Sequence, residues 1–186
     1  MTDWFTTLDG LWRESWHQLE AVAHDRRSAA RHTVLSTIGL SGGPESRITV
    51  LRDANQTAGT VVVHTDSTTV KVAELRANPR AALHLWQARE DLQIRLRGHV
   101  EIAEGEAVRD LWTRVPNGSR PSYGVEPAPG TPISASDAYT RIINPDHFAV
   151  LTLVIAEVDI VHLSADYHRR ARYCRADGWT GQWLAP

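Results

Sequence analysis

The chain has 186 residues, of which 42% are hydrophobic and 23% charged, and its formal net charge is -2. This composition supports a buried core and excludes an intrinsically disordered chain. The length suits one domain over residues 1–186, or a subunit whose site a second copy completes. The weak negative charge excludes a general attraction to nucleic acid or to anionic membranes, so any anion must be held by a local basic cluster.

A single cysteine, Cys174, excludes a disulfide framework and fits a reducing compartment, so we expect a cytoplasmic protein. The first residues lack the basic start and apolar run of a signal peptide, and no apolar run is long enough to span a bilayer. The nine histidines are scattered, and none has the spacing of a metal site. We therefore predict no metal, no membrane partner and no nucleic-acid partner.

The hydrophobic pattern predicts a helix first and strands thereafter. Apolar residues at helical spacing predict an amphipathic helix over residues 3–25. The polar run 24–28 ends this helix. It is either a solvated linker or, alternatively, a segment that binds a phosphate. Short alternating strands are then expected at 33–40, 47–52, 60–65, 80–86, 91–103, 148–161, 167–174 and 178–184. Further helices are expected at 69–77, 104–115 and 134–143, with a surface loop over 116–132.

This order of elements predicts a mainly β protein with flanking helices, and a barrel more than a parallel α/β sheet. Strands joined by short connections are expected to be antiparallel neighbours. Gly98, inside the strand 91–103, predicts a bulge or bend of the kind that barrels need to curve. No strand leads into a glycine-rich phosphate loop, so neither a dinucleotide-binding Rossmann unit nor a P-loop is supported.

Two segments near the middle of the chain could hold an anion. Arg47 and Arg52 begin and end one apolar strand, and each guanidinium is a planar fork that matches a phosphate. The run from His64 to Lys71 ends a strand and opens a helix, with hydroxyl groups, a lysine and free backbone N–H groups. Such a run forms a phosphate cradle or, equally, an ordinary helix N-cap.

Two other segments carry polar groups on strands. Gln93, Arg95 and Arg97 alternate with apolar residues and share one face, which is either functional or simply solvent-facing. The segment 167–173 concentrates arginine, histidine and tyrosine. Nucleic-acid binding is the rival interpretation there, but the run is isolated in a net-acidic chain.

Seven short motifs occur in one order along the chain: Arg47 to Arg52, His64-Thr65, Thr69-Val70-Lys71, Asn78-Pro79-Arg80, Gln93 to Gly98, His168-Arg169-Arg170 and Leu184-Ala185-Pro186. From about residue 33 to residue 186 the chain thereby resembles the pyridoxamine 5′-phosphate oxidase family. More narrowly, it is similar to the short FMN-binding relatives known as pyridoxamine 5′-phosphate oxidase-related proteins. The resemblance implies an FMN-binding split β-barrel that works as a homodimer, with FMN in the clefts between subunits.

The resemblance also implies roles for particular residues. Arg47 and Lys71, helped by Thr69, are expected to bind the FMN phosphate. The ribityl chain and the ring are expected to be lined by Arg52, His64, Thr65 and Gln93. Arg170 is expected to reach the flavin from the other subunit, and His168 to lie near the substrate. No catalytic residue is identified.

Several departures from the family pattern bear on the substrate. Val70 stands where the family has a phosphate-binding arginine, and no tryptophan lies near residues 160–162, where the oxidases have one against the flavin. Asp166 replaces an arginine that helps to hold the pyridoxal substrate in the oxidases. We therefore expect an FMN-dependent oxidoreductase, of the oxidase or reductase type, for a small molecule other than pyridoxamine 5′-phosphate. The alternatives are a non-catalytic flavin carrier or sensor, and a deazaflavin- or heme-binding member of the same fold.

Overall fold

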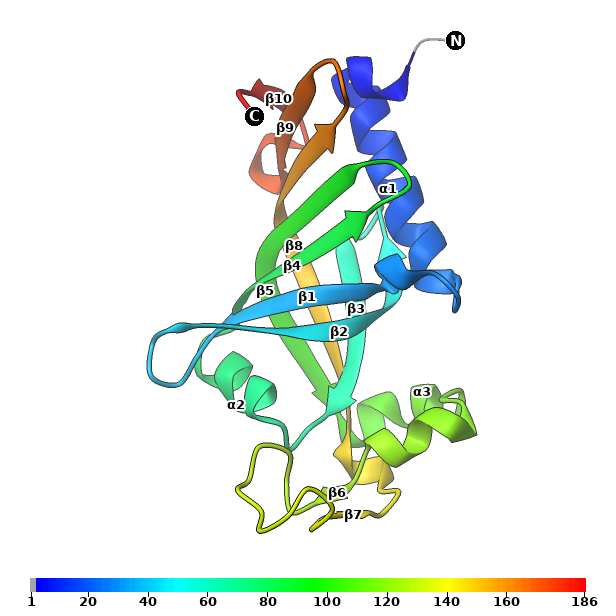
Figure 1. Cartoon of the computed structure of the whole chain (residues 1–186), viewed down its shortest axis with the longest axis vertical. Coiled ribbons are helices and arrows are strands. Elements are labelled where there is room, and N and C mark those ends of the chain that lie inside the picture. The colour runs from blue at the N-terminus through cyan, green and yellow to red at the C-terminus, as the bar shows by residue number, and fades with distance from the viewer. Residues whose placement is uncertain (1–2) are drawn as a thin grey trace.

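The computed structural model describes residues 3–186, in which the long strands close into a barrel (Figure 1). In this described part the barrel has six strands: β1 (His32–Ile38), β2 (Pro44–Asn55), β3 (Thr60–Asp66), β4 (Arg80–Gln87), β5 (Leu92–Glu104) and β8 (Phe148–Leu163). Closure depends on β8, whose first half pairs with both β3 and β5. The second half of β8 continues beyond β3 and carries β9 (His168–Cys174) and then β10 (Gly181–Leu184). The expected mainly β barrel with antiparallel neighbours is confirmed.

Alternation along the strands directs one face of each strand into the core. Thr49 and Leu51 of β2 are buried, while Ile48, on the opposite face of the same strand, is 61% exposed, as a two-residue period requires.

One end of the barrel is covered by α1 (Leu8–His24), which buries Leu11, Trp16, Leu19 and Val22. Near the other end, a smaller apolar cluster comprises Val108, Val115, Tyr123, Phe148 and Val150.

Gly98 marks the bend in β5, as its position in the sequence predicts. The pairing of β5 with β8 shifts register between Arg97 and Gly98. A Cβ atom at position 98 would lie 1.9 Å from the carbonyl oxygen of Val154, so only glycine allows this approach of the two backbones. The bulge lets one long strand pass from the closed part of the barrel to the open extension.

The predicted helices are confirmed in part. The expected helix 3–25 is a single 3₁₀ turn, Trp4–Thr6, followed by α1, because the Thr7 side chain caps the helix by accepting from the Gly10 N–H. The expected helix 69–77 is α2 (Val70–Ala77), and the segment 104–115 is a 3₁₀ turn followed by α3 (Arg109–Thr113). No helix in residues 3–186 has the length and apolar character needed to cross a membrane.

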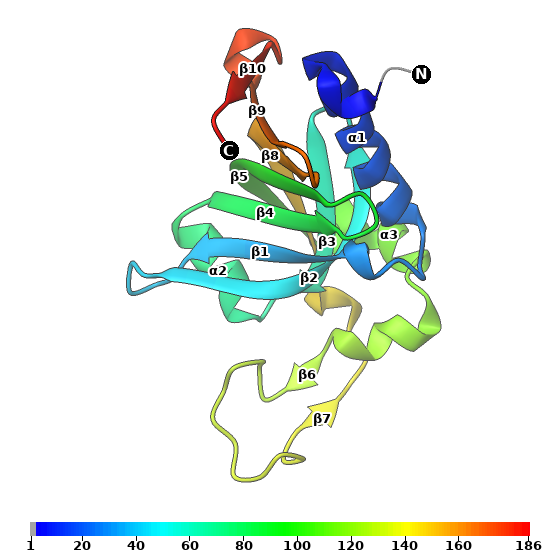
Figure 2. The ribbon, with the colours of Figure 1, turned by 45° about the horizontal axis from the view of Figure 1, so that its top comes forward.

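The predicted helix 134–143 is wrong. This stretch has no helix and contributes only β7 (Thr140–Arg141), which pairs with β6 (Val125–Glu126). Every residue from 134 to 143 is exposed, so the segment has no surface on which a short amphipathic helix could bury its apolar face. Figure 2 shows the β6–β7 ribbon and its connecting loop standing away from the barrel.

Candidate functional site

Arg47, near the start of β2, is held by a buried carboxylate on α2. Its guanidinium donates to Glu74 at 2.7 Å and also to the Thr37 hydroxyl of β1. Thr37 donates in turn to the same Glu74 oxygen at 2.6 Å. The Glu74 side chain is only 3% exposed, so the arginine that faces it is fixed in position beside α2. A buried carboxylate of this kind needs its cationic partner, since removing one member leaves an unpaired charge.

The turn between β3 and α2 collects a lysine, two hydroxyl groups and a helix N-terminus. Lys71 Nζ donates to Thr65 Oγ1 at 3.0 Å. The Thr69 hydroxyl donates to the Asp66 carbonyl at 2.7 Å and does not cap α2, so the interpretation as an ordinary side-chain N-cap is wrong. Burial, with the Arg47 charge adding to it, lowers the pKa of Lys71, against the opposing effects of Asp66 and Glu74. Uncapped helix N–H groups beside two cations make a cradle for an oxyanion.

Asp66, which no sequence pattern singled out, holds this turn in place. One carboxylate oxygen accepts from the backbone N–H of Thr68 at 2.8 Å, and the other accepts from the N–H of Gly124 at 2.8 Å. His147 Nδ1 lies 3.5 Å from the same carboxylate. Burial acts to raise the pKa of Asp66, but the hydrogen bonds from Thr68 and Gly124 outweigh it and lower the pKa. The start of α2 is therefore tied to the long segment that follows α3.

Arg52 and His64 lie on the outer faces of β2 and β3, next to one another. Each alternates with residues that point into the core, such as Leu51 and Val63. The His64 ring packs edge-on against Phe148 with 5.0 Å between ring centroids. Burial, with the Arg52 charge adding to it, lowers the pKa of His64 to about 4, so the imidazole is neutral at pH 7.

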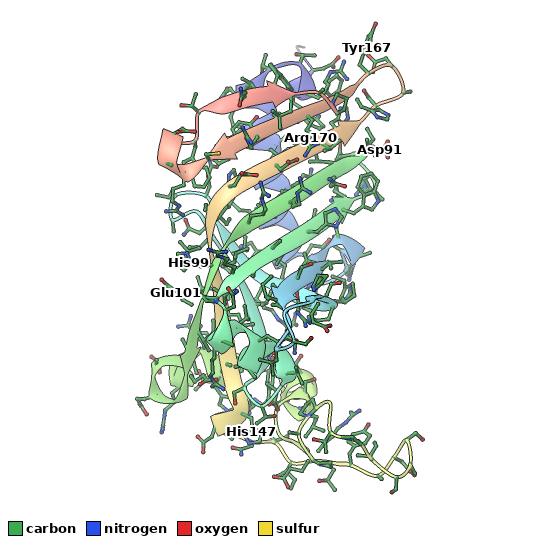
Figure 3. The ribbon with its side chains drawn as sticks, turned by 90° about the vertical axis from the view of Figure 1, so that its left-hand side faces the viewer. Asp91, His99, Glu101, His147, Tyr167 and Arg170 are labelled. Atoms are coloured by element: carbon green, nitrogen blue, oxygen red, sulfur yellow. The ribbon has the colours of Figure 1, made fainter. Side chains whose placement is uncertain are left out.

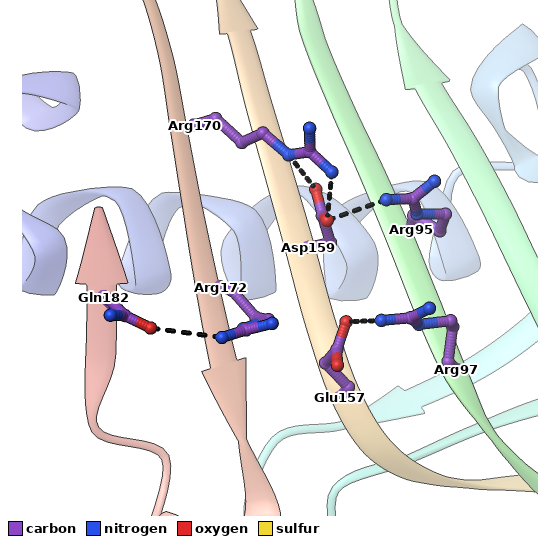
Figure 4. Close-up of polar contacts among 7 residues, drawn as sticks. All are labelled: Arg95, Arg97, Glu157, Asp159, Arg170, Arg172 and Gln182. Atoms are coloured by element: carbon purple, nitrogen blue, oxygen red, sulfur yellow. Dashed lines mark hydrogen bonds and ion pairs between the residues drawn. The ribbon is translucent and has the colours of Figure 1, made fainter. Parts of the chain in front are cut away.

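Arg170 lies on β9, on the outer face of the sheet extension (Figure 3). Its guanidinium donates to Asp159 of β8 at 3.1 and 2.8 Å, and Arg95 of β5 donates to the same carboxylate at 2.7 Å (Figure 4). Asp159 is 3% exposed at its side chain. Burial acts to raise the pKa of Asp159, but hydrogen bonds from the two arginines outweigh it. The buried carboxylate thus orients two guanidinium groups on one face.

The face predicted for Gln93, Arg95 and Arg97 is confirmed, and the interpretation as a plain solvent-facing side is incomplete. Arg97 contacts Glu157 of β8, just as Arg95 contacts Asp159. Gln93 is half-buried on the same strand, opposite Trp86 of β4. Figure 4 shows this row of paired charges across β5, β8 and β9.

His168 begins β9 and is exposed, beyond a tight turn that joins β8 to β9. Within that turn the Asp166 carboxylate accepts from the Ser164 hydroxyl at 2.7 Å and lies 3.3 Å from an Arg169 nitrogen. The hydrogen bond from Ser164, and then that from Arg169, lowers the pKa of Asp166. Tyr167 marks the exposed tip of this turn in Figure 3.

The candidate residues therefore form two groups in one chain. One group surrounds the start of α2 and the adjoining faces of β2 and β3, and it contains Arg47, Arg52, His64, Thr65, Thr69 and Lys71. The other lies on β5 and β9, and it contains Gln93, His168 and Arg170. Figure 1 places α2 and β9 toward opposite ends of the molecule, so a single chain does not bring Lys71 of α2 together with His168 and Arg170 of β9.

Comparison with known proteins identifies the family. The family model described as "Pyridoxamine 5'-phosphate oxidase, FMN-binding domain" matches residues 12–104, which is half of the chain. The chain belongs to this family. The matched region contains Arg47, Lys71 and the turn between β3 and α2, and it ends at the last residue of β5.

Several named proteins are similar in sequence to large or small parts of this chain. A pyridoxine/pyridoxamine 5'-phosphate oxidase of Nostoc punctiforme is 28% identical over 159 residues, covering 78% of this chain and 73% of that protein. One from Thermosynechococcus vestitus is 37% identical over 87 residues, covering 46% of this chain and 40% of that protein. One from Legionella pneumophila is 26% identical, and the match covers 82% of this chain but 61% of that protein.

Solved structures establish the split-barrel fold. A pyridoxamine 5'-phosphate oxidase-related, FMN-binding protein of N. punctiforme superposes with a TM-score of 0.76 at 22% identity, covering 94% of this chain and 97% of that one. PhzG of Burkholderia lata, solved in complex with tetrahydrophenazine-1-carboxylic acid, gives a TM-score of 0.72 at 21% identity, covering 94% and 91%. The expected fold class, the split β-barrel of this family, is thus confirmed.

The burial of His64 makes a prediction about its protonation. A folded-state pKa near 4, below the ordinary value near 6.5, means that folding favours the neutral ring. This contribution to stability is complete above about pH 6.5 and is lost as the pH falls toward 4. We expect the His64 imidazole signals in NMR, assigned by their loss in His64→Phe, to titrate with a midpoint near pH 4. A midpoint close to 6.5 would show that the ring is solvated.

Proposed function

We propose that this protein is an FMN-dependent oxidoreductase whose substrate is a small molecule other than pyridoxamine 5′-phosphate, and that it works as a homodimer. The observation that carries the proposal is the cradle formed by Arg47, Lys71, Thr65 and the uncapped start of α2. This cradle lies inside the region that matches the FMN-binding family model. It combines two cations, hydroxyl donors and a helix N-terminus, which are the groups that a phosphate monoester requires.

The electrostatics of the cradle fit a phosphate. The pKa of Lys71 is lowered by burial and by the nearby Arg47, so an anion placed between the two cations would relieve both effects. Glu74 fixes the direction of Arg47 and neutralises part of its charge. Because Val70 provides no second guanidinium, we expect Lys71 and the helix N–H groups to supply most of the remaining attraction.

Other side chains would orient the rest of the cofactor. Arg52 and His64 lie next to the cradle on the outer faces of β2 and β3, where the neutral His64 ring can both donate and accept a hydrogen bond. FMN, when bound, supplies the electron-accepting chemistry that no side chain can provide. Arg170, held by Asp159, is the residue we propose to approach from a second subunit, where its fixed charge would favour electron uptake.

A carrier or sensor is the principal alternative, because no general acid or base has been assigned in the described chain. The two roles differ in one observable. A redox enzyme bleaches its flavin absorbance when its reducing substrate is added, whereas a carrier does not. The absorption spectrum of the purified protein also separates a flavin from a deazaflavin or a heme.

The cradle predicts a specific loss of phosphate recognition. Arg47→Ala and Lys71→Ala should each weaken FMN binding by roughly 1.5–3 kcal/mol, because each removes a charge-assisted hydrogen bond. Riboflavin, which lacks the phosphate, should lose much less affinity. Fluorescence quenching of both ligands measures the difference. Arg76→Ala is the matched control, since Arg76 is on the same helix but pairs with Glu104 at the surface. Equal losses for the two ligands would place both residues away from the phosphate.

The separation of the two groups of residues predicts complementation between subunits. Arg47→Ala and Arg170→Ala chains should each bind FMN weakly alone. When they are refolded together, the mixed dimer contains one site with both arginines intact, so about one quarter of all sites should regain tight binding. A mixture of Arg47→Ala with Lys71→Ala gives no intact site and serves as the control. Recovery in neither mixture would show that one chain forms the site by itself.

The position of Asp166 predicts poor activity toward pyridoxamine 5′-phosphate. The family's arginine at this position is replaced by a carboxylate that is held within its own turn by Ser164 and Arg169. Loss of one charged hydrogen bond costs about 1.5–3 kcal/mol, which lowers kcat/KM about tenfold to a hundredfold. Hydrogen peroxide or pyridoxal phosphate production by the FMN-loaded protein measures it. A kcat/KM near 10⁴ M⁻¹s⁻¹ or above, the ordinary range of enzymes, would restore the assignment as this oxidase.

A further inference from the structure

The two ends of the segment that stands away from the barrel meet at one carboxylate. We call residues 124–144, which contain β6, β7 and their connecting loop, the arm (Figure 2). The N–H of Gly124, at the start of the arm, donates to Asp66 at 2.8 Å. His147, just after the arm, lies 3.5 Å from the same carboxylate, and its carbonyl accepts from the Ser67 N–H at 2.8 Å. The base of the arm is therefore fastened to the turn between β3 and α2.

Beyond this base, the arm makes no hydrogen bond to the barrel in the part of the chain that the structure describes. The hydrogen bonds of residues 125–143 are internal or go to Gly124, and no residue in that range is buried. Segments with exposed backbone hydrogen bonds and few buried contacts open at the lowest cost in free energy. The order of the arm therefore depends on its base, and the base depends on Asp66.

The fastening point requires glycine. Gly124 has a φ of +107°, and a Cβ atom there would lie 1.7 Å from the carbonyl oxygen of Ile142. This close approach lets the Gly124 carbonyl accept from the Ile142 N–H at 2.8 Å while the Gly124 N–H points to Asp66. A side chain at position 124 would push the two strands of the arm apart or pull the N–H away from the carboxylate.

Asp66 also organises the phosphate cradle. Its carboxylate accepts from both the N–H and the hydroxyl of Thr68, and its backbone carbonyl accepts from the Thr69 hydroxyl at 2.7 Å. These bonds hold the turn that leads into α2, whose first N–H groups no side chain caps. The charge of Asp66 also acts to raise the pKa of Lys71, against the effect of burial. The carboxylate is therefore within electrostatic reach of the cradle.

Charge alone makes a carboxylate unfavourable at this place. Hydrogen bonds from Thr68 and Gly124 lower the pKa of Asp66, so its negative charge is present at neutral pH. Because like charges repel, an Asp66 that acted only through its charge would weaken phosphate binding, and its removal would tighten it. Positioning of the turn is the contribution that offsets this repulsion.

We propose that Asp66 is a positioning residue that couples the phosphate cradle to the arm, so that a phosphate bound at the start of α2 orders residues 125–143. The inference rests on the proposed function, because FMN is the ligand expected to bring that phosphate. A phosphate that accepts from the N–H groups of α2 fixes the turn, the turn fixes the Asp66 carboxylate, and the carboxylate fixes Gly124. Such coupling is reciprocal, so a change that loosens the base of the arm weakens phosphate binding by the same factor.

Hydrogen exchange of residues 125–143, followed by mass spectrometry on the full chain, tests the coupling. We expect FMN to slow this exchange about fivefold or more, the lower end of typical couplings between sites. Riboflavin, which lacks the phosphate, should leave it unchanged. An amide has one acceptor oxygen where a carboxylate has two, so Asp66→Asn cannot accept from both Thr68 and Gly124. In Asp66→Asn the arm should therefore exchange equally fast with and without FMN.

Binding affinities test the reciprocal effect. Asp66→Ala and Gly124→Ala should each weaken FMN binding about fivefold or more and riboflavin binding less than about twofold, as measured by fluorescence quenching. Gly124→Ala is informative because it changes the base of the arm and leaves every side chain of the cradle in place. Asp53→Ala is the matched control, since Asp53 is an exposed aspartate on the neighbouring strand β2.

The outcomes separate this inference from the proposed function. Tighter FMN binding by Asp66→Ala would show that Asp66 acts only through its charge, and equal protection of the arm by riboflavin and FMN would show that the phosphate is not the signal. Either result overturns the inference. Should the wild type bind no FMN, the proposed function fails, and inorganic phosphate replaces FMN in the exchange measurement. Absence of protection by inorganic phosphate then overturns the inference as well. If Asp66→Ala does not fold, Asp66→Asn and Gly124→Ala decide the question.

Discussion

The double pairing of β8 is the constraint on which the rest of the structure depends. Its first half hydrogen bonds to β3 and β5 together, which closes the barrel, and its second half leaves β3 and takes up β9. A strand that is hydrogen-bonded along both edges cannot shift its register by one residue, because the shift would move every core-facing side chain to the outer face. The closed half places the end of β3 against Phe148, and the open half places Asp159 between Arg95 and Arg170.

Three buried carboxylates hold candidate residues and a turn in fixed positions on this barrel. Glu74 fixes Arg47, Asp66 fixes the turn that opens α2, and Asp159 fixes Arg170. Each carboxylate has at most 4% of its residue or side-chain surface exposed. Breaking such a pair by removing one partner typically costs 3–5 kcal/mol, because the remaining charge is left unpaired. The buried carboxylates therefore hold the half-buried Arg47 and Arg170 in one geometry, and changing either partner of a pair lowers the stability of the fold.

The sequence predicts the strands well and the polar networks poorly, for a physical reason. Alternation is a local property, so the strands containing Arg47, His64 and Gln93 could be placed from a few residues each. Glu74 and Asp159 could not be recognised as partners, because they meet arginines 27 and 64 residues away only after the barrel closes. The error at 134–143 has the opposite origin: a locally plausible helix had no surface to pack against.

The same reasoning explains why the basic pocket between the end of α1, β2, β3 and the segment after α3 could not be predicted from the sequence. Arg26 belongs to a polar run that, taken alone, is indistinguishable from a solvated linker, and Arg114 belongs to the end of a short helix. Only the folded chain shows that α1 ends beside Arg52 and that Arg31 is buried there, with no ion pair to it in residues 3–186. Natural proteins break the rule of paired buried charge chiefly where function requires it.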